Sequence, residues 1–206
     1  MDEENGGDIA AAIEKAVADG ETDNILIILK NSGENEAETE NQPLILDSKV
    51  FEILSKSDVV FLTVSTGAAN CEFSRDVIDS IVEQNVGDVR LNIKQTDVGA
   101  SGNEAVKDRV GFEISLTGED GKKIEFFGGA YVKVTVQVPE SLRDKDIVMV
   151  YSDGENHFSP VEGSLNKDGT YTFKTRHLSE YILMTRQDAE KLYNYISDFG
   201  TLKAYV

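Results

Sequence analysis

Four polar residues near the end of the chain are the first candidates for chemistry: His177, Ser179, Glu180 and Tyr181. A serine hydrolase needs a serine, a histidine and an acid in contact. On a strand, however, His177, Ser179 and Tyr181 point to one side while Glu180 points to the other. The Gly-x-Ser-x-Gly turn that presents a nucleophilic serine does not occur in the sequence. We therefore expect structural hydrogen bonds here, and we predict that the chain is not an enzyme.

Metal and cofactor sites find little support in the sequence. Cys71 is the only cysteine, which excludes an intrachain disulfide and a cysteine-based zinc site. The segments Ser152–His157 and Asn166–Gly169 lack the alternating oxygen ligands and final glutamate of a calcium loop. The glutamates of Asn31–Gln42 are another calcium candidate, but the segment is typical of an exposed loop. Glycine-rich phosphate loops do not occur, and we predict no cofactor.

Aromatic side chains are the remaining candidates for ligand contact. A module that binds a glycan or a host protein needs an exposed aromatic platform. The chain contains no tryptophan, which argues against sugar stacking as its main purpose. The candidates for ligand contact are Tyr151, Phe158 and Tyr171, with Tyr193 and Tyr195 further along.

Length and charge limit the class of protein. The 206 residues suit one large domain or two small ones, and a hydrophobic content of 40% is enough for a core. With 38 acidic and 20 basic residues, the net charge is −18, so the chain repels nucleic acid and anionic lipid. The sequence has no apolar run of the ~18 residues that a membrane helix needs. We expect no nucleic-acid partner and no membrane span in this segment.

The elements that must position these side chains differ between the two halves of the chain. In Tyr131–Val138 a valine occupies every second position, which predicts a strand with one buried face. Asp153-Gly154 and Asp168-Gly169 predict tight turns between further strands. Glu119-Asp120-Gly121 predicts a hairpin between a strand at Val110–Leu116 and a strand at Ile124–Phe127. The second half is therefore expected to be an antiparallel meander or a sandwich-like structure, followed by a helix over Gln187–Ser197.

The first half alternates helices and strands. The predicted helices cover Asp8–Ala18, a short segment that begins at Asp47-Ser48, and Ser74–Gln84. The predicted strands are Ile25–Leu29, Leu44–Leu46, Val59–Val64, Asn70–Phe73 and Asp88–Gln95.

These patterns predict an α+β fold that is mostly antiparallel sheet. We expect an N-terminal α+β subdomain over residues 8–98 and an all-β subdomain over residues 109–186. Residues 187–206 form a C-terminal helix and tail. The two halves either share one core or form two domains, and the patterns leave both open.

The end of the second half resembles a β-rich module of Gram-positive (Firmicutes) secreted and cell-surface proteins. The closing strand of that module typically reads Thr-x-His-Phe-Ser-x-Tyr. This sequence has Thr175, His177, Ser179 and Tyr181 at the matching positions, with Leu178 in place of Phe. A helix–strand–strand unit that commonly precedes the module is matched at Leu46, Val50, Phe51, Leu54, Phe61, Val64 and Phe73.

The resemblance implies a function outside the cell. The expected role is a non-catalytic structural or spacer module of a bacterial cell-surface protein, located in the extracellular space or cell envelope. Its expected partners are the neighbouring domains of the larger protein, with a cell-wall glycan or a host protein as further partners. A glycan- or protein-binding adhesion module is the alternative. A hydrolase that uses a pair of carboxylates is the second alternative.

Overall fold

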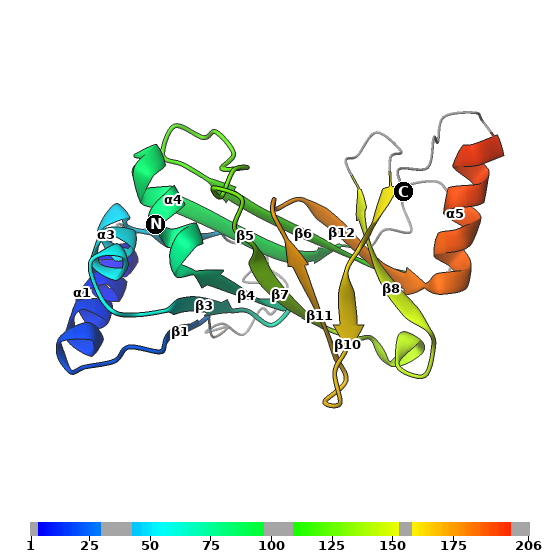
Figure 1. Ribbon diagram of the computed structural model, residues 1–206. Helices are drawn as coiled ribbons and strands as arrows, with labels where there is room; N and C mark the ends of the chain where they lie inside the picture. Colours follow the sequence, from blue (N-terminus) through cyan, green and yellow to red (C-terminus); the bar gives the residue numbers. More distant parts are fainter. Residues whose placement is uncertain (1–3, 30–42, 97–108, 153–157, 199–206) are drawn as a thin grey trace.

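Two six-stranded sheets pack face to face, with helices at both ends (Figure 1). The structure is a computed structural model, and it describes residues 4–29, 43–96, 109–152 and 158–198. Both sheets are mostly antiparallel, and the α+β prediction is confirmed. In the part of the chain that is described, no helix is both long enough and apolar enough to span a bilayer.

The first sheet has the strand order β1-β3-β4-β7-β11-β10. All of its neighbours pair antiparallel except β1 and β3, which are parallel. The strands are β1 (Asn24–Ile28), β3 (Phe61–Ser65), β4 (Ala69–Ser74), β7 (Val132–Gln137), β11 (Thr170–Thr175) and β10 (Gly163–Leu165).

The second sheet has the order β2-β5-β6-β12-β8-β9 and is antiparallel throughout. Its strands are β2 (Leu44–Leu46), β5 (Val89–Thr96), β6 (Arg109–Thr117), β12 (Glu180–Thr185), β8 (Ile147–Ser152) and β9 (Phe158–Val161).

The C-terminal strands form the sandwich-like structure rather than a simple meander. Strand β7 pairs with β4 and β11, whereas β8, the next strand in the chain, pairs with β12 and β9 in the second sheet. A 3₁₀ turn, η2 (Glu140–Leu142), lies in this crossing. The chain then places β8 and β9 in the second sheet, β10 and β11 in the first, and β12 in the second again.

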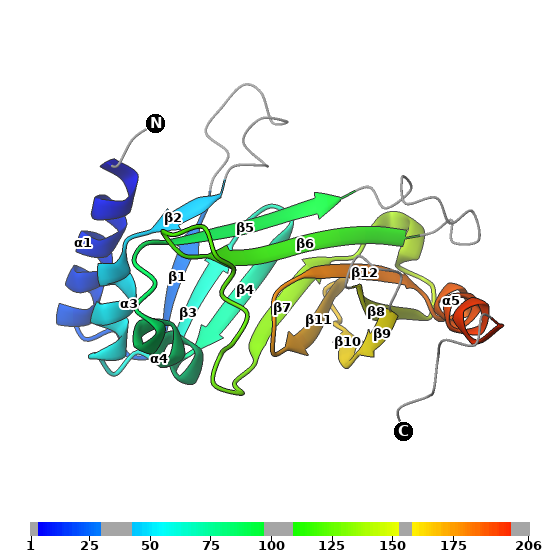
Figure 2. The ribbon, with the colours of Figure 1, turned by 90° about the horizontal axis from the view of Figure 1, so that it is seen from above.

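Both predicted halves contribute strands to both sheets (Figure 2). The first sheet joins β4 of residues 8–98 to β7 of residues 109–186, and the second joins β5 to β6. One continuous hydrophobic cluster contains residues from both segments. The sequence left open whether the two halves share one core or form two domains, and in the structure they share one core.

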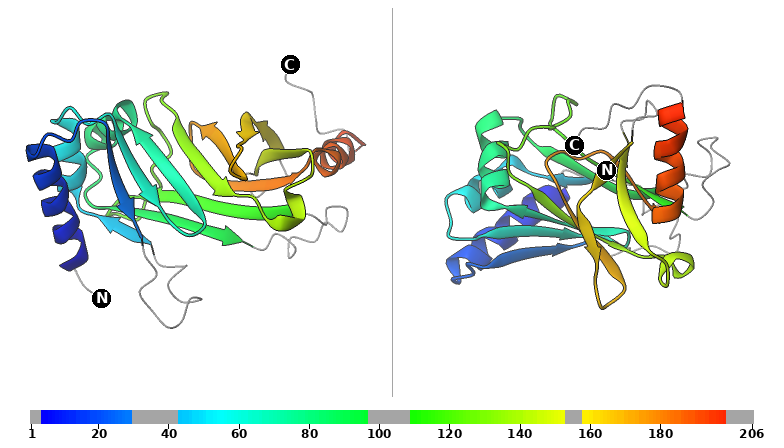
Figure 3. Two further views of the ribbon diagram at one scale, coloured as in Figure 1. Left: turned by 90° about the horizontal axis from the view of Figure 1, so that it is seen from below. Right: turned by 45° about the vertical axis from the view of Figure 1, so that its right-hand side comes forward.

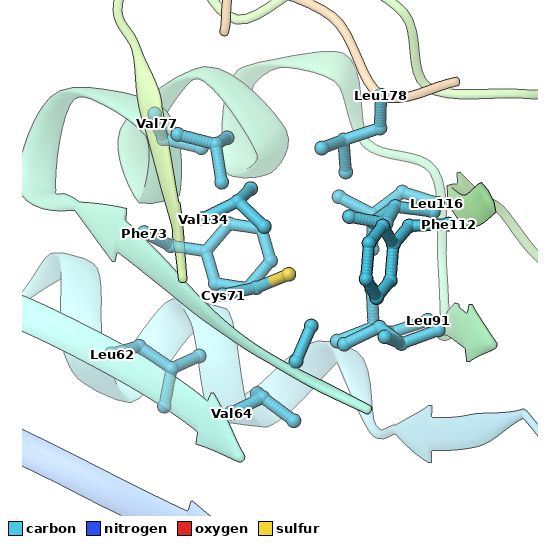
Figure 4. Packing of buried hydrophobic residues seen from close by; sticks show 14 of the residues in the cluster. Leu62, Val64, Cys71, Phe73, Val77, Leu91, Phe112, Leu116, Val134 and Leu178 are labelled. Carbon is cyan, nitrogen blue, oxygen red and sulfur yellow. The ribbon is translucent and has the colours of Figure 1, made fainter. Parts of the chain in front are cut away.

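The core lies between the inner faces of the two sheets. Val132, Val134 and Val136 of β7 are at most 1% exposed, as their spacing predicted. Figure 4 shows Cys71 and Val134 of the first sheet facing Phe112 of the second. Cys71 is fully buried, and burial raises the pKa of its thiol to about 12. Its predicted role as a small buried hydrophobe is consistent with this position.

The helices of the described residues lie at the two ends of the sandwich (Figure 3). They are α1 (Glu4–Ala18), α3 (Ser48–Ser55) and α4 (Arg75–Gln84) at the first end, and α5 (Arg186–Asp198) at the second. Asp47 caps α3 by accepting a hydrogen bond from Lys49 N at 2.8 Å. Asp8 was predicted to cap α1 but lies inside it, because the helix begins at Glu4.

Arg75 ties α4 to the end of α3. Its guanidinium donates to the carbonyl oxygens of Ser55 at 2.5 Å and Val59 at 2.9 Å, and also to that of Ser57. Ser55 is the last residue of α3, where helix carbonyls lack intrahelical partners, and Ser57 and Val59 lie in the segment that follows. One planar side chain thus fixes the connection from α3 to β3.

The predicted turns form where the structure describes them. Gly121 and Gly169 have φ angles of +77° and +84°, which glycine adopts readily. Beyond the first turn, however, the pairing is a single bridge between Thr117 and Lys123, so the predicted strand Ile124–Phe127 does not form. Four further predicted loop, turn and tail segments lie entirely outside the described residues: Asn31–Gln42, Asp97–Lys107, Asp153-Gly154 and Phe199–Val206.

Candidate functional site

The three aromatic residues predicted to contact a ligand do not form one surface. Tyr171 on β11 is 4% exposed and belongs to the core between the sheets. Tyr151 on β8 is half-buried against the same core. Phe158 on β9 pairs with Ser152, the neighbour of Tyr151, and packs on the opposite face beside α5. The side chains of Tyr193 and Tyr195 on α5 are outside the described part of the structure.

The motif that carries the family resemblance forms a corner between the sheets. The chain leaves the first sheet after Thr175 and enters the second at Glu180. Thr175 Oγ1 and the hydroxyl of Tyr181 are 2.7 Å apart, and both groups bond the carbonyl oxygen of His177. A tyrosine hydroxyl that bonds the backbone just upstream is a known way to stabilise such crossings in β-sandwiches.

Ring contacts complete this corner. The His177 ring meets Tyr151 edge-on at 4.5 Å between centroids, and Tyr181 lies 4.8 Å from Phe173. Tyr181 has no exposed surface, and this burial raises the pKa of its hydroxyl above the usual value. These residues therefore use their polar groups to hold the corner in place.

The predicted alternation of side chains through residues 177–181 is wrong. Leu178 and Tyr181 both face the core, although they are separated by an odd number of positions. The reason is that β12 begins only at Glu180, so the preceding residues follow the bend between sheets rather than a strand. Ser179 Oγ donates to the carbonyl oxygen of Ser152 at 3.5 Å. The expected hydrogen bond from Ser179 to neighbouring backbone is therefore present, whereas His177 Nε2 is buried without a hydrogen-bond partner among the described residues.

A groove of about 690 Å³ lies between α4 and the segment that leads into β7. Helix α4 buries Val77, Ile78 and Ile81 in the core. Its acidic residues occupy the other face of the helix and line the groove. The lining residues are Ser74, Asp76, Asp79, Ser80, Glu83, Phe127, Gly128, Gly129, Ala130 and Tyr131.

One hydrogen bond, from Gln84 to Phe126, and the buried ring of Phe127 hold the segment that faces α4. Gln84 Nε2 donates to the carbonyl oxygens of Ser80 and Phe126, each at 2.9 Å. The Phe127 side chain is 1% exposed and anchors the segment in the core. Gly128 and Gly129, with φ angles of +61° and +85°, then turn the chain toward β7. The groove is thus built on a helix and an anchored loop.

The groove combines negative charge with an aromatic wall. Tyr131 is 47% exposed, and the Arg176 guanidinium lies 4.6 Å from the centre of its ring. Asp79 Oδ1 is buried and has no hydrogen-bond partner among the described residues. In the described ranges, no group of three or more histidine, cysteine, aspartate or glutamate side chains is arranged to hold a metal ion. The arrangement suits a ligand that offers hydrogen-bond donors and a ring or aliphatic face.

Sequence reasoning did not find this groove. The acidic face of α4 was visible as the positions between Val77, Ile78 and Ile81. By its sequence, Gly128-Gly129 predicts only an entry to the strand that begins near Tyr131. Nothing in the local pattern indicates that these two segments meet, because their contact depends on how α4 packs at the end of the sandwich.

Comparisons with known proteins leave the family open. No family model matches the sequence, and no curated protein matches it significantly. The resemblance to a surface-protein module through Thr175, His177, Ser179 and Tyr181 therefore remains a prediction. The geometry of the corner accounts for what these residue types do in this chain, independently of any relative.

Proposed function

We propose that this chain is a non-catalytic structural module that holds the neighbouring domains of an extracellular, cell-envelope protein apart. The observation that carries the proposal is the position of its outer helices. Helix α1 lies at one end of the elongated sandwich and α5 at the other (Figures 2 and 3). A chain that enters at one end and leaves at the other separates whatever is joined to it.

The sheets between these ends suit such a role. Strand β7 is bonded on both sides, to β4 and β11, and β6 is bonded to β5 and β12. The segments near the two ends are therefore linked through continuous ladders and one core. A module of this kind keeps its length without a disulfide, because the two apolar faces stabilise each other.

The experiment is a distance measurement across the module. Fluorescent proteins are fused before α1 and after α5, and energy transfer is compared with a flexible Gly/Ser linker of equal length. A rigid spacer gives a narrow distribution of donor–acceptor distances that moderate salt does not change, whereas the flexible linker gives a broad one. In the matched variant Val134→Asp, which is expected to unfold the core, the distribution broadens toward the linker's. Equally broad distributions in the parent and the linker would overturn the proposal.

The second candidate is a glycan- or protein-binding module that uses the groove beside α4. The exposed ring of Tyr131 next to Asp79 favours it. Co-sedimentation with Gram-positive cell walls and insoluble polysaccharides tests this candidate. Saturable pelleting that is lost in Tyr131→Ala and kept in Tyr151→Phe would support it. Pelleting that is unaffected by Tyr131→Ala would place binding elsewhere.

The carboxylate-dependent hydrolase, the second alternative from the sequence, stays a prediction.

A further inference from the structure

Strand β1 forms one edge of the first sheet. It pairs with β3, and in the described part of the structure no other strand lies beside it (Figure 1). Edge strands expose unpaired backbone groups that invite another strand to add on, and proteins commonly protect them with lysine, proline or a bulge. The sequence of β1, Asn-Ile-Leu-Ile-Ile, contains neither lysine nor proline, and its pairing with β3 is regular.

The direction of the backbone groups follows from one hydrogen bond. Leu29 N, just after β1, donates to the carbonyl oxygen of Ser65 on β3 at 2.9 Å. Because successive residues of a strand point their N–H groups to opposite sides, Ile27 and Ile25 also point toward β3. The N–H and C=O groups of Leu26 and Ile28 consequently point to the open edge.

The same two residues expose their side chains. Leu26 is 53% exposed and Ile28 is 56% exposed, whereas Ile25 is 8% exposed and faces the core. The open edge therefore carries backbone groups that no strand of the described residues pairs with, and two aliphatic side chains at alternate positions. An extended peptide recognises such an edge through backbone hydrogen bonds, and side chains at alternate positions supply specificity.

Charge indicates which kind of strand fits. Asp19, Glu21 and Asp23 are exposed and directly precede β1. The whole chain carries a net charge of −18, so a second copy of it is repelled at close range. A partner strand with lysine or arginine is attracted by the same field.

We propose that β1 binds an extended segment of a partner protein in which aliphatic residues alternate with basic ones, as an added strand of the first sheet. The aliphatic residues cover Leu26 and Ile28, and a basic residue pairs with Glu21 or Asp23. This inference goes beyond the spacer function and does not depend on it. The edge at β10 is a weaker site because β10 has only three residues.

The first test uses a fluorescent synthetic peptide, Lys-Val-Lys-Ile-Thr-Val-Lys, and its counterpart with each lysine changed to glutamate. We expect saturable binding of the basic peptide, weakened by salt, and at least roughly tenfold weaker binding of the acidic one. Hydrogen exchange should slow at the Leu26 and Ile28 amides when the basic peptide binds. No saturable binding, protection of these amides in the free chain, or dimerisation in its place would overturn the proposal.

Variants of the edge complete the test. Leu26→Pro removes an outward N–H without removing a bond to β3, so the chain should melt near the parent and lose the peptide. Ile28→Lys should also abolish binding of the basic peptide, because it replaces one of the two exposed aliphatic side chains of the edge. The matched control is Leu165→Lys, which makes the same change at a 46% exposed leucine on the opposite edge. If Leu26→Pro fails to fold, the two lysine variants decide, and equal loss in both contradicts the proposal.

Discussion

At the residue scale, the hydroxyl of Tyr181 is a polar group inside the core whose hydrogen bonds are made by nearby residues. It is completely buried, and it shares its hydrogen bonds with Thr175 and the backbone of His177. A buried hydroxyl is tolerated when these bonds are made and costs stability when they are not. The hydrogen bonds of the corner therefore account for Thr175, His177 and Tyr181, which are among the residues that carry the family resemblance.

Tyr181→Phe tests this role. We expect the free energy of unfolding to fall by about 1 kcal/mol, the net value of one hydrogen bond. Thr175→Val should cost a similar amount, and the double variant less than the sum, because each change breaks the same contact. Urea unfolding measures all three. The control Tyr131→Phe, at an exposed ring, should leave stability unchanged. Fully additive losses would show that the two hydroxyls do not interact.

Cys71 predicts how stability changes at alkaline pH. Burial raises the pKa of its thiol to about 12 from 9.0, so above pH 9 the unfolded chain releases this proton before the folded one does. The folded state then loses stability as pH rises, by up to about 1.4 kcal/mol per unit. The stability of Cys71→Ala should fall less steeply between pH 9 and 12, as measured by urea unfolding. Parallel curves for the two proteins would mean that the thiol titrates normally.

At the element scale, β7 is the strand on which both segments of the chain depend. It lies in the middle of the first sheet, with β4 from one segment and β11 from the other on its two sides. Its inner residues Val132, Val134 and Val136 face the core, and its outer residues Lys133 and Gln137 face solvent. A substitution that disrupts the inner face of β7 therefore affects its pairing with both β4 and β11.

Val134→Asp should unfold the protein. An unpaired carboxylate at a position with 0% exposure costs several kcal/mol. We expect nearly complete loss of the strand signal in circular dichroism, rather than the partial loss that unfolding of one segment would give. Gln137→Asp is the matched control, because it adds the same charge at an exposed position of β7 and should melt within a few degrees of the parent. A Val134→Asp protein that melts like the parent would mean that the strand faces the other way.

At the scale of the whole molecule, residues 8–98 and 109–186 share two sheets and one core. Each segment completes the sheets of the other, and the core includes side chains from both. The helices α1 and α5 extend this structure in opposite directions, which is the geometry behind the proposed spacer. The acidic net charge then governs which partners approach it.

A fragment of residues 109–186 should therefore not fold alone. Without β4 and β5, strands β7 and β6 would become new edges with exposed inner faces. We expect a disordered amide spectrum by NMR for the fragment and one unfolding transition for the full chain by calorimetry. Mixing the fragment with residues 8–98 is a useful control, since it restores the missing strands. A fragment with a dispersed spectrum of its own would contradict the shared core.

Much of the secondary structure could be predicted from local patterns. The cap at Asp47, the apolar face of Val77, Ile78 and Ile81, and the alternating valines of β7 each determine an element through contacts a few residues away. The bounds of α1 were predicted less well, because Glu4 and its neighbours have no distinct start signal. The candidate aromatic residues were predicted from their type alone, and type does not tell which face of a sheet a ring occupies.

The sequence by itself determined the α+β class, the faces of the main strands and the turns at Gly121 and Gly169, because these depend on neighbouring residues. Only the tertiary structure decided that β7 and β8 belong to different sheets, that Tyr151 and Phe158 lie on opposite faces, and that α4 meets the loop before Tyr131. Alternation states which side of a strand is apolar but not which strand lies beside it. Pairing and groove formation depend on burying many apolar faces at once, which is a property of the whole fold.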